Sequence, residues 1–467
     1  MTMEARSLNW IAAACGGRLL TGSPETPVCR VSSDSRQIQR GDLFFALPGE
    51  RFDGHAFLGE VAGKGAAAAV VSRGRSPDRL PNCALIAVED TRQALGRLAA
   101  RYRRDFSLPV LAVAGSNGKT TTKELVASVL EQRFPTLRSE ASFNNDIGVP
   151  LTLLRLETAH RAAVLEAGTN HPGELAPLLR MISPRLGVLT SIGREHLEFF
   201  GDLAGVAQEE GWLAELLPAE GILLADGDCQ WTGRIARRGP ARLVRVGLSE
   251  ANDWRAADLR PDNQGVTFRV EGPRAGLAGE YRINLVGRHQ VLNALFAIAV
   301  GAEFGLERPE IGQGLARCKP PRMRLQLWEH NGVSVLDDAY NANADSMLRA
   351  LQTLVELPCR GRRVAVLGDM AELGANSEAA HEEVGRLAAE LGIGQLFAVG
   401  KMAPLMARGA RGAGLNRVLE FADVEGAGLA LKSFLKNGDL LLLKASRATR
   451  LERIAQMLRG SDVTKRN

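Results

Sequence analysis

The residues best suited to chemistry in this sequence stand in one short glycine-rich stretch. In GSNGKTTT, the residues Gly118, Lys119 and Thr120 match the last three positions of a phosphate-binding loop. In such a loop the backbone N–H groups and a helix N-terminus face the anion, the lysine binds the β- and γ-phosphates, and the hydroxyl binds Mg²⁺. The place of the usual first glycine holds Val113, and the nearest glycine is Gly115. The stretch therefore predicts a nucleotide phosphate site of an unusual type.

The elements on either side of this stretch are those that a phosphate loop requires. The apolar run VLAVAG (110–115) precedes it and predicts a buried strand. After it, apolar residues recur at the spacing of one helix face, at Leu125, Val126, Val129 and Leu130. Gly-Lys-Thr alone occurs by chance, but its position between a strand and a helix favours phosphate binding.

Strand and helix signals alternate along most of the chain, which is typical of an α/β protein. The 467 residues are too many for one ordinary core. The alternation restarts after DFSLP (105–109) and again near CKPPRMR (318–324), so we expect three domains. Their predicted bounds are 1–107, 108–317 and 318–467. We expect the central domain to be a doubly wound, mostly parallel sheet that carries the phosphate loop, and the last domain to be Rossmann-like.

Individual elements follow from apolar runs that are bounded by turn residues. In the first domain we expect strands at 41–49 and 83–90 and a helix at 91–104, with Thr91 as its N-cap. In the central domain we expect parallel strands at 110–115, 162–168, 186–193 and 221–228, an antiparallel pair at 265–272 and 281–287, and a helix at 288–305. In the last domain we expect strands at 332–340, 362–370, 394–400 and 438–446 and a helix at 378–391.

The bulk composition argues against several classes of function. The 58 Lys and Arg residues exceed the 53 Asp and Glu residues by five, but they are scattered, and only 5% of residues are aromatic, so we expect no nucleic-acid surface. None of the six cysteines has Cys-x-x-Cys spacing, which disfavours zinc and favours reduced thiols. The first residues lack a signal-peptide pattern, and no apolar run approaches the ~18 to 20 residues of a membrane helix. We expect a cytoplasmic monomer without stable membrane insertion.

Three further polar residues lie near the predicted loop. Glu166 stands in the run at 162–168, at the carboxyl edge where open α/β sheets bind ligands, but alone such an acid is more often a solvated strand end. Beside a Mg²⁺-bound phosphate loop it becomes a candidate metal ligand. His196 follows the run at 186–193, and a lone histidine is more often structural than a ligand. Asn293 is expected on a helix, where it can simply cap the helix or face solvent.

The loop GSNGKTTTKEL resembles the shortened phosphate loop of the Mur ligase family, whose members build the peptide stem of the bacterial cell wall. Further stretches resemble this family in the same order, at 32–57, 143–154, 165–175, 195–207, 336–347 and 367–374. The resemblance covers nearly the whole chain. It implies an N-terminal domain that binds a UDP-linked substrate, a central ATP-binding domain and a C-terminal ligase domain.

The matching stretches are most similar to the branch of this family that ligates D-alanyl-D-alanine to UDP-N-acetylmuramoyl-tripeptide. The resemblance implies an acyl-phosphate intermediate, ATP and Mg²⁺ as cofactors, and a pentapeptide product for peptidoglycan. The third residue of the tripeptide, diaminopimelate or lysine, is left open. Folylpolyglutamate synthase shares the loop, but its loop lies much nearer the N-terminus. A regulatory P-loop NTPase or a small-molecule kinase is not excluded by composition.

The resemblance also implies roles for individual residues. Catalysis is implied for Lys119, Glu166, His196 and Arg324, with Arg322 as an alternative to Arg324. Metal binding is implied for Thr120, Glu166, His196 and Glu210. ATP binding is implied for Gly115, Ser116, Asn117, Gly118, Lys119, Thr120, Thr121, Asn293, Arg324 and Asp338. Substrate binding is implied for Ser35, Arg36, Asn144, Asn145, Asp146, Tyr340, Asn341, Asn343, Lys444, Ser446 and Arg447.

The chain departs from the family pattern at three places. Gln290 replaces the first Asn of the pattern that contains Asn293, and Ala445 replaces a Gly. In GVAQEEGWL, Glu210 stands where the family has a lysine that is usually carbamylated and helps to hold a second Mg²⁺. We expect Glu210 to supply this negative charge permanently, because Mg²⁺ favours oxygen ligands. Glu209 as the functional acid, or a merely solvated acidic pair, are the alternatives.

Overall fold

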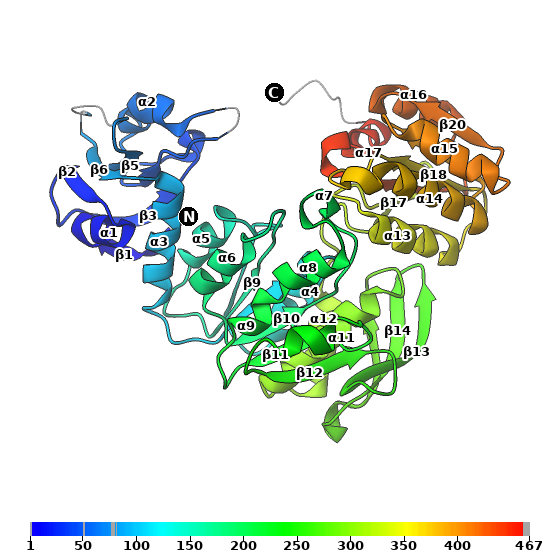
Figure 1. Ribbon diagram of the computed structural model, residues 1–467, viewed down its shortest axis with the longest axis horizontal. Helices are drawn as coiled ribbons and strands as arrows, with labels where there is room; N and C mark the ends of the chain where they lie inside the picture. Colours follow the sequence, from blue (N-terminus) through cyan, green and yellow to red (C-terminus); the bar gives the residue numbers. More distant parts are fainter. Residues whose placement is uncertain (1, 50–51, 76–79, 81, 461–467) are drawn as a thin grey trace.

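The structure consists of three α/β units that follow one another along the chain. The computed structural model describes residues 2–49, 52–75, 80 and 82–460. Each unit is built on its own sheet, and the strands of the three sheets lie between residues 2 and 88, 110 and 283, and 326 and 444. In Figure 1 the first and third units lie at the two ends of an arc, with the second unit between them. The predicted three-domain α/β architecture is confirmed, and the exact domain bounds stay predictions.

The N-terminal unit is a six-stranded sheet in the order β1-β3-β4-β5-β6-β2. Its strands are β1 (Thr2–Ser7), β2 (Arg18–Thr21), β3 (Pro27–Ser32), β4 (Leu43–Phe45), β5 (Ala68–Ser72) and β6 (Ala84–Val88). Its helices are α1 (Leu8–Cys15), α2 (Leu58–Gly63) and α3 (Thr91–Arg103). The strands predicted at 41–49 and 83–90 are confirmed as β4 and β6, and the predicted helix at 91–104 is confirmed as α3.

The N-terminus of α3 corrects one prediction. The N-cap is Asp90, whose carboxylate accepts the backbone N–H of Gln93 at 2.9 Å. Thr91, which we predicted to be the cap, is the first helical residue, and its buried hydroxyl donates instead to the carbonyl oxygen of Ala46 at 2.9 Å. Both residue types cap helices, so only the packing of the turn against the sheet decides between them.

The central unit is a nine-stranded sheet in the order β15-β14-β13-β12-β11-β10-β7-β9-β8. Its strands are β7 (Val110–Ala114), β8 (Thr136–Arg138), β9 (Ala162–Glu166), β10 (Leu186–Leu189), β11 (Ile222–Asp226), β12 (Arg242–Gly247), β13 (Trp254–Asp262), β14 (Gly265–Glu271) and β15 (Gly279–Ile283). Strands β8 to β13 pair in parallel, whereas β13-β14 and β14-β15 are antiparallel, as predicted for the last two. The predicted parallel strands are confirmed as β7, β9, β10 and β11.

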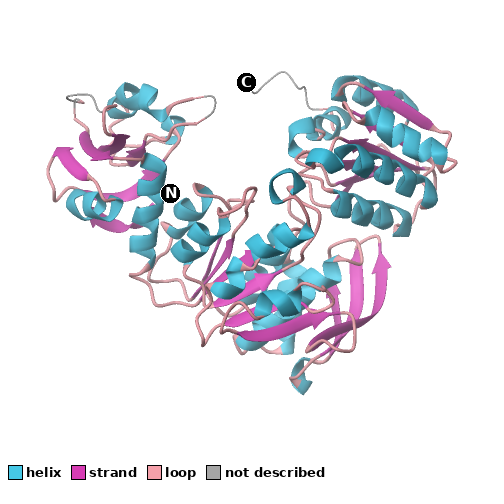
Figure 2. Ribbon diagram, viewed as in Figure 1, coloured by secondary structure: helices cyan, strands magenta, loops and turns pink. Residues whose placement is uncertain are grey.

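Helices cover both faces of the central sheet (Figure 2). They are α4 (Lys119–Leu130), α5 (Gly148–Leu153), α6 (Leu175–Ile182), α7 (Leu197–Phe200), α8 (Leu203–Glu210), α9 (Trp212–Glu215), α10 (Thr232–Ala236), α11 (Gln290–Glu303) and α12 (Arg308–Arg317). The packing of strand β7 explains why its residues are apolar throughout. Leu111 and Val113 pack into the core under α4 and α11, while Ala112 and Ala114 pack into the opposite core. A strand buried on both faces reads as a continuous apolar run, which is how the sequence revealed it.

The C-terminal unit is a six-stranded sheet in the order β16-β17-β21-β18-β19-β20, parallel except for the β16-β17 pair. Its strands are β16 (Gln326–His330), β17 (Val333–Asp337), β18 (Arg363–Gly368), β19 (Gln395–Val399), β20 (Val418–Phe421) and β21 (Leu440–Lys444). Its helices are α13 (Ala344–Glu356), α14 (Ser377–Glu390), α15 (Ala403–Gly412), α16 (Val424–Phe434) and α17 (Glu452–Leu458). All four predicted strands of this unit and its predicted helix at 378–391 are confirmed.

The units are joined in two different ways. One apolar core runs from the N-terminal unit into the central unit through α3, whose Leu98 and Tyr102 share it with Leu153 and Leu178. The cores of the C-terminal unit are separate, and among the described residues Val286 is the single residue of the central unit that belongs to one of them. The two joints therefore differ in kind. Within the described part of the chain, no helix is both long and apolar enough to cross a membrane.

Candidate active site

The predicted phosphate loop lies between β7 and α4, and its backbone explains its glycines. Gly115 and Gly118 have φ of +110° and +90°, a region that side chains other than glycine rarely adopt. A Cβ on Gly115 would lie 2.6 Å from the Thr190 hydroxyl oxygen, and one on Gly118 would lie 2.6 Å from Asn293 Oδ1. Both glycines are therefore required by conformation and by close approach. Ser116, Asn117, Gly118, Lys119, Thr120 and Thr121 line a cleft of about 360 Å³.

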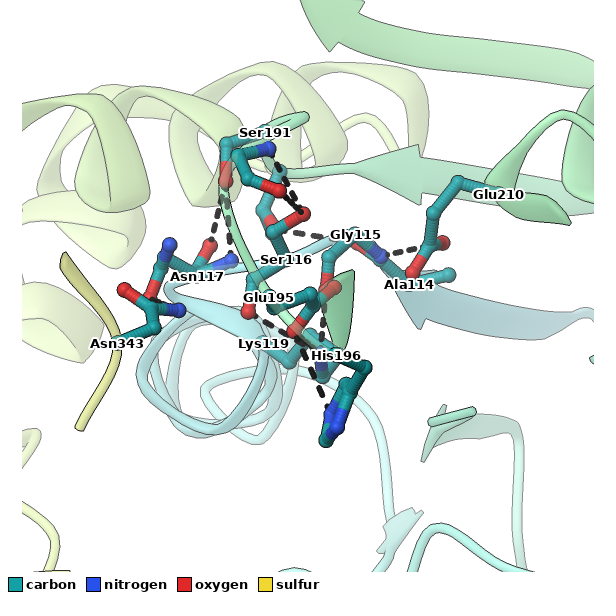
Figure 3. A network of polar contacts seen from close by, with 12 residues as sticks. Ala114, Gly115, Ser116, Asn117, Lys119, Ser191, Glu195, His196, Glu210 and Asn343 are labelled. Carbon is teal, nitrogen blue, oxygen red and sulfur yellow. Dashed lines mark hydrogen bonds and ion pairs between the residues drawn. The ribbon is translucent and has the colours of Figure 1, made fainter. Parts of the chain in front are cut away.

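Lys119 is the charged centre of the loop. Its Nζ donates to the carbonyl oxygens of Gly115 and Ser116 at 2.5 and 3.2 Å and lies 3.6 Å from Oε2 of Glu195 (Figure 3). Burial lowers the pKa of Lys119, but the carboxylates of Glu195, Glu210 and other neighbours outweigh burial, and the net pKa is raised. Lys119 thus keeps its positive charge in the cleft, as an anion-binding lysine must.

Glu166 ends β9 with one oxygen occupied and one free. It is 1% exposed, and its Oε1 accepts the amide of Asn144 at 2.9 Å. Its Oε2 is buried without a hydrogen-bond partner among the described residues, and the residue lines the cleft. Nearby, the hydroxyl of Thr120 lies 3.3 Å from that of Ser142. A buried carboxylate oxygen without a partner is costly unless a cation or donor completes the site.

His196 follows β10, and the C-terminal unit orients its ring. Its Nδ1 pairs with the carboxylate of Glu372, and its Nε2 lies 4.0 Å from Oε2 of Glu195. Both His196 and Glu195 line the cleft. Sequence reasoning selected His196 and missed Glu195, although both follow the same strand end. Glu195 could have been found from its position after β10, at the edge of the sheet where the phosphate loop also lies.

Glu210 approaches the phosphate loop but is not among the residues that line the cleft. Its Oε2 accepts the backbone N–H of Gly115 at 2.8 Å, and its Oε1 is buried without a partner among the described residues (Figure 3). Burial raises the pKa of Glu210 to about 8, against the opposing effects of Lys119 and the Gly115 N–H. The observed contact is thus to the loop backbone. Its metal-binding role stays a prediction.

Glu209, the alternative acid, has a different set of partners. Its carboxylate accepts the backbone N–H groups of Gly173 and Leu175, each at 2.9 Å. These bonds hold the start of α6 and leave Glu209 away from the loop. Among the described residues, no group of three or more His, Cys, Asp or Glu is close enough to hold a metal by itself.

Two amides on α11 close one side of the cleft. Asn293 accepts the Thr122 hydroxyl at 3.1 Å and donates to Oε1 of Gln290 at 2.8 Å. Gln290, which replaces an Asn of the family pattern, therefore orients Asn293. His289 also lines the cleft, and burial followed by the charges of Arg349 and Lys444 lowers its pKa to about 3, so it is neutral. Sequence reasoning did not select His289.

The C-terminal unit supplies the opposite wall of the cleft. Arg324 donates to the Ser142 hydroxyl at 3.1 Å, and its guanidinium carbon lies 4.2 Å from the centroid of the Tyr340 ring. Lys444 pairs with Asp338 at 2.5 Å. The cleft lining includes seven of the predicted residues of this unit, Arg324, Asp338, Tyr340, Asn341, Asn343, Lys444 and Arg447, but neither Ser446 nor Arg322. The structure thus brings residues from two distant parts of the chain to one cleft.

Four other predicted residues are not among those that line the cleft, namely Gly115, Ser35, Arg36 and Asp146. Ser35 and Arg36 belong to the N-terminal unit, where the side chain of Arg36 is 86% exposed and pairs with Asp34 at 2.9 Å. Asp146 pairs with Arg92 on α3 at 2.8 Å. Its neighbours Asn144 and Asn145 do line the cleft. The structure therefore does not gather all predicted substrate residues into one pocket.

Comparison with known proteins matches each of the three units. The Mur ligase family catalytic domain matches residues 28–103, the Mur ligase middle domain matches 113–301, and the Mur ligase glutamate ligase domain matches 323–447. The chain is 34% identical to UDP-N-acetylmuramoyl-tripeptide–D-alanyl-D-alanine ligase of Bacillus subtilis over 98% of this chain and 99% of that protein. It is 39% identical to the enzyme of the same name from Escherichia coli, over 92% and 93%.

Solved structures agree with these sequence matches. MurF from Acinetobacter baumannii superposes with a TM-score of 0.89 at 30% identity, over 98% of this chain and 99% of that one. MurF ligase from Thermotoga maritima in complex with ADP superposes with a TM-score of 0.81 at 26% identity, over 92% and 97%. The fold, the phosphate loop and the relatives over nearly the full length agree, and the chain belongs to the Mur ligase family.

Proposed function

We propose that this protein ligates D-alanyl-D-alanine to UDP-N-acetylmuramoyl-tripeptide with conversion of ATP to ADP and phosphate, giving the UDP-linked pentapeptide of peptidoglycan synthesis. The observation that carries the proposal is the cleft in which Lys119 of the central unit faces Arg324 and Lys444 of the C-terminal unit. Three cations around one site suit a transferring phosphoryl group. The relatives that cover nearly the whole chain bear the name of this reaction.

The residues around the loop fit Mg²⁺. Glu166 offers a buried carboxylate oxygen without a partner among the described residues, and Thr120 offers a hydroxyl in the same cleft. Mg²⁺ needs only one or two such protein oxygens, because it keeps waters and binds substrate phosphates. We propose that Glu166 and Thr120 hold the ion, with His196 contributing from the next strand end. When bound, Mg²⁺ neutralises charge on the phosphates.

The protein residues make a poor electrophile reactive. A carboxylate resists attack by an amine, so the terminal carboxylate oxygen of the tripeptide first attacks the γ-phosphorus of ATP and ADP leaves. Lys119 and Arg324 hold the negative charge that spreads over the phosphoryl oxygens. The amino group of D-alanyl-D-alanine then attacks the acyl carbon, phosphate leaves, and the nitrogen loses its proton. We expect closure of the two walls around the bound substrates to exclude water, which would otherwise hydrolyse the acyl phosphate.

We propose that Ser35 and Arg36 bind the UDP part of the larger substrate. The exposed Arg36 guanidinium is held by Asp34 and is available to a diphosphate. We expect Arg36→Ala to raise KM for the UDP-linked substrate about 10-fold or more, because charge-assisted hydrogen bonds to phosphate are lost. KM for ATP serves as the internal control, and an equal rise in both constants would contradict the assignment.

The proposed reaction is tested by ADP release across a panel of UDP-linked tripeptides and dipeptides. We expect release to require both UDP-N-acetylmuramoyl-tripeptide and D-alanyl-D-alanine, with the panel deciding between diaminopimelate and lysine. Nucleotide hydrolysis that ignores both substrates would indicate a regulatory NTPase instead. Because ATP and UDP-linked precursors are cytoplasmic compounds, we propose that the protein acts in the cytoplasm. We further propose that it is a monomer, which light scattering measures.

A further inference from the structure

Residues 191–196, which come shortly after the end of β10 at Leu189, lie between the phosphate loop and the C-terminal unit. Three of them contact the loop. The backbone carbonyl of Ser191 accepts the N–H of Ser116 at 2.9 Å, and the N–H of Gly193 donates to the Ser116 hydroxyl at 2.8 Å. Glu195 approaches Lys119 at 3.6 Å. Figure 3 shows Ser191 and Glu195 beside the loop residues that they contact. We call residues 191–196 the bridging segment.

Arg194 and His196 of this segment contact the C-terminal unit. The backbone N–H of Arg194 donates to Oδ2 of Asp345 at 2.7 Å, and its Nε donates to Oδ1 at 2.8 Å. Its Nη1 donates to the carboxylate of Glu383 at 2.8 Å. His196 pairs with Glu372. The bridging segment thus contacts the loop through Ser191, Gly193 and Glu195 and the C-terminal unit through Arg194 and His196.

The residues bound by Arg194 belong to two helices. Asp345 lies in the first turn of α13, whose N-cap is Asn343, and Glu383 lies on α14. Asn343 also donates to Oδ1 of Asn117 in the phosphate loop at 3.1 Å (Figure 3). Arg194 therefore fixes both helices at the place where α13 meets the loop.

The fit at this place is close. A Cβ on Gly193 would lie 2.7 Å from Oδ2 of Asp345 and 3.3 Å from Nδ2 of Asn117. The space beside the Gly193 Cα is thus filled by Asp345 of α13 and Asn117 of the loop, with no room for a methyl group. A shift of the phosphate loop would therefore displace the first turn of α13, and a shift of α13 would displace the loop.

We propose that Arg194 is a positioning residue that couples the phosphate loop to the C-terminal unit, so that Arg324 and Lys444 close over the phosphates in register with the loop. The inference rests on the proposed function, in which the loop binds ATP. Its physical basis is a guanidinium bonded to two carboxylates from different helices, which fixes direction as well as distance. Nucleotide binding and closure then stabilise each other, as coupled sites must.

The chain offers a matched control at the other end of α13. Arg288 of the central unit pairs with Glu356, the last residue of α13, at 3.1 Å. This ion pair also joins the two units, but it lies at the opposite end of the helix from the bridging segment. Simple adhesion between the units predicts equal effects of Arg194→Ala and Arg288→Ala, whereas coupling through the bridging segment predicts an effect of Arg194→Ala alone.

The test compares the wild type with Arg194→Ala, Arg194→Lys and Arg288→Ala in the full chain. We measure kcat, the affinity for ADP, and hydrogen exchange of residues 377–386 with and without ADP. In the wild type and in Arg288→Ala we expect ADP to slow exchange in this part of α14. In Arg194→Ala we expect that protection to disappear and kcat to fall about 10-fold or more, a typical size for coupling between sites. We expect Arg194→Lys to retain only part of the protection and of kcat, since lysine cannot bind both carboxylates in one plane.

The outcomes separate the inference from the function beneath it. Protection of α14 by ADP in a folded Arg194→Ala variant would overturn the inference, and so would equal losses of kcat in both alanine variants. A wild type that does not bind ADP would overturn the proposed function as well. Should Arg194→Ala fail to fold, Asp345→Asn removes the charge of the partner while keeping an acceptor, and the same loss of protection is expected.

Discussion

Acidic side chains surround the lysine of the phosphate loop. Lys119 has Glu195 at 3.6 Å, and Glu210 lies on the far side of the loop at the Gly115 N–H. The lysine also folds back onto the carbonyls of its own loop. Bound phosphates offer stronger, charged acceptors than these carbonyls. In the absence of nucleotide, these contacts keep Lys119 charged and in position to bind phosphate oxygens.

At the scale of the residue, we expect Lys119→Ala to abolish ligation in a folded protein. The substitution removes the cation that stabilises charge on the transferring phosphoryl group, which is worth about 100- to 1,000-fold in kcat. The measurement is ADP release under saturating substrates, with circular dichroism as the check of folding. The exposed Lys432→Ala on α16 is the control and keeps full activity. Turnover within a few-fold of the wild type would contradict the assignment of the loop.

Glu210 makes stability depend on pH. Its pKa in the folded protein is raised from 4.5 to about 8, so folding favours the protonated acid. Its contribution to stability is therefore fully present below pH about 4.5 and is lost as pH rises toward about 8. Glu210→Gln keeps an acceptor for the Gly115 N–H and cannot ionise. We expect its melting temperature to exceed that of the wild type more at pH 8.5 than at pH 5.

This prediction is measured by thermal unfolding of the metal-free protein at both pH values. The exposed Glu220→Gln is the control and follows the wild type. If the difference between Glu210→Gln and the wild type is the same at pH 5 and pH 8.5, Glu210 is ionised in the folded protein at both. The predicted metal role of Glu210 is tested by measuring kcat against Mg²⁺ concentration in the same variant. We expect Mg²⁺ to bind more weakly when the negative charge is removed.

At the scale of elements, burial explains several of the strands that the sequence reveals. Strands β7 and β9 are buried at every residue and were predicted as apolar runs. Strand β13 was not predicted, because its residues include Arg255, Arg260 and Pro261 and only two of its nine residues are buried. Its strand character comes from pairing with β12 and β14, which no local pattern records. The short, half-exposed edge strands β16 and β20 were missed for the same reason.

The candidate site was predictable to the extent that it lies at strand ends. The phosphate loop, Glu166 and His196 follow β7, β9 and β10, and the carboxyl ends of neighbouring parallel strands meet at one edge of the sheet. Contacts between units were not predictable in this way. Arg194 bonds to Asp345, 151 residues away, and only the packing of the two units brings them together.

The bridging segment gives a prediction at this scale. We expect Gly193→Ala to lower kcat about 10-fold, because the methyl group would meet Asp345 and Asn117 and force α13 from the loop. Gly312→Ala on α12 is the control, since nothing lies within 4 Å of its added Cβ. That control should keep full activity and gain about 0.5–1 kcal/mol in stability from helix propensity. Normal kcat in Gly193→Ala would show that the bridging segment and α13 can move apart without loss of activity.

At the scale of the whole molecule, the two joints between units have opposite chemistry. The N-terminal and central units share one apolar core around α3. The C-terminal unit is held mainly by ion pairs and hydrogen bonds, such as those of Arg194, His196 and Arg288. Apolar cores are close-packed and resist sliding, whereas polar contacts exchange with water at low cost. The first joint is therefore rigid, and the second is suited to opening and closing around nucleotide.

The rigid joint contains one polar contact that we expect to matter. Tyr102 of α3 is fully buried, and its hydroxyl donates to the Leu156 carbonyl and accepts the Glu4 N–H, each at 2.7 Å. We expect Tyr102→Phe to cost about 1–3 kcal/mol, because the Leu156 carbonyl stays buried and the Glu4 N–H partly buried without a partner. Urea unfolding measures the loss.

The control for this change is Tyr281→Phe in the central sheet. The hydroxyl of Tyr281 donates to the carbonyl of Leu277 at 2.8 Å, within one unit. We expect a smaller loss, of about 1 kcal/mol, since only one bond is removed. If both variants lose the same free energy of unfolding, the two hydrogen bonds of Tyr102 stabilise the joint no more than one bond within a unit does.

The contrast between the two joints has a consequence for how such chains recombine. A crossover between relatives at 318–325 exchanges a unit whose cores are its own, so the two parental halves need to agree only at a few polar pairs. A crossover at 104–109 divides one apolar core between two parents, whose side chains were never selected to interlock. Functional chimeras should therefore accumulate at the later position. Within them, we expect full activity only where Arg194 is inherited together with Asp345 and Glu383.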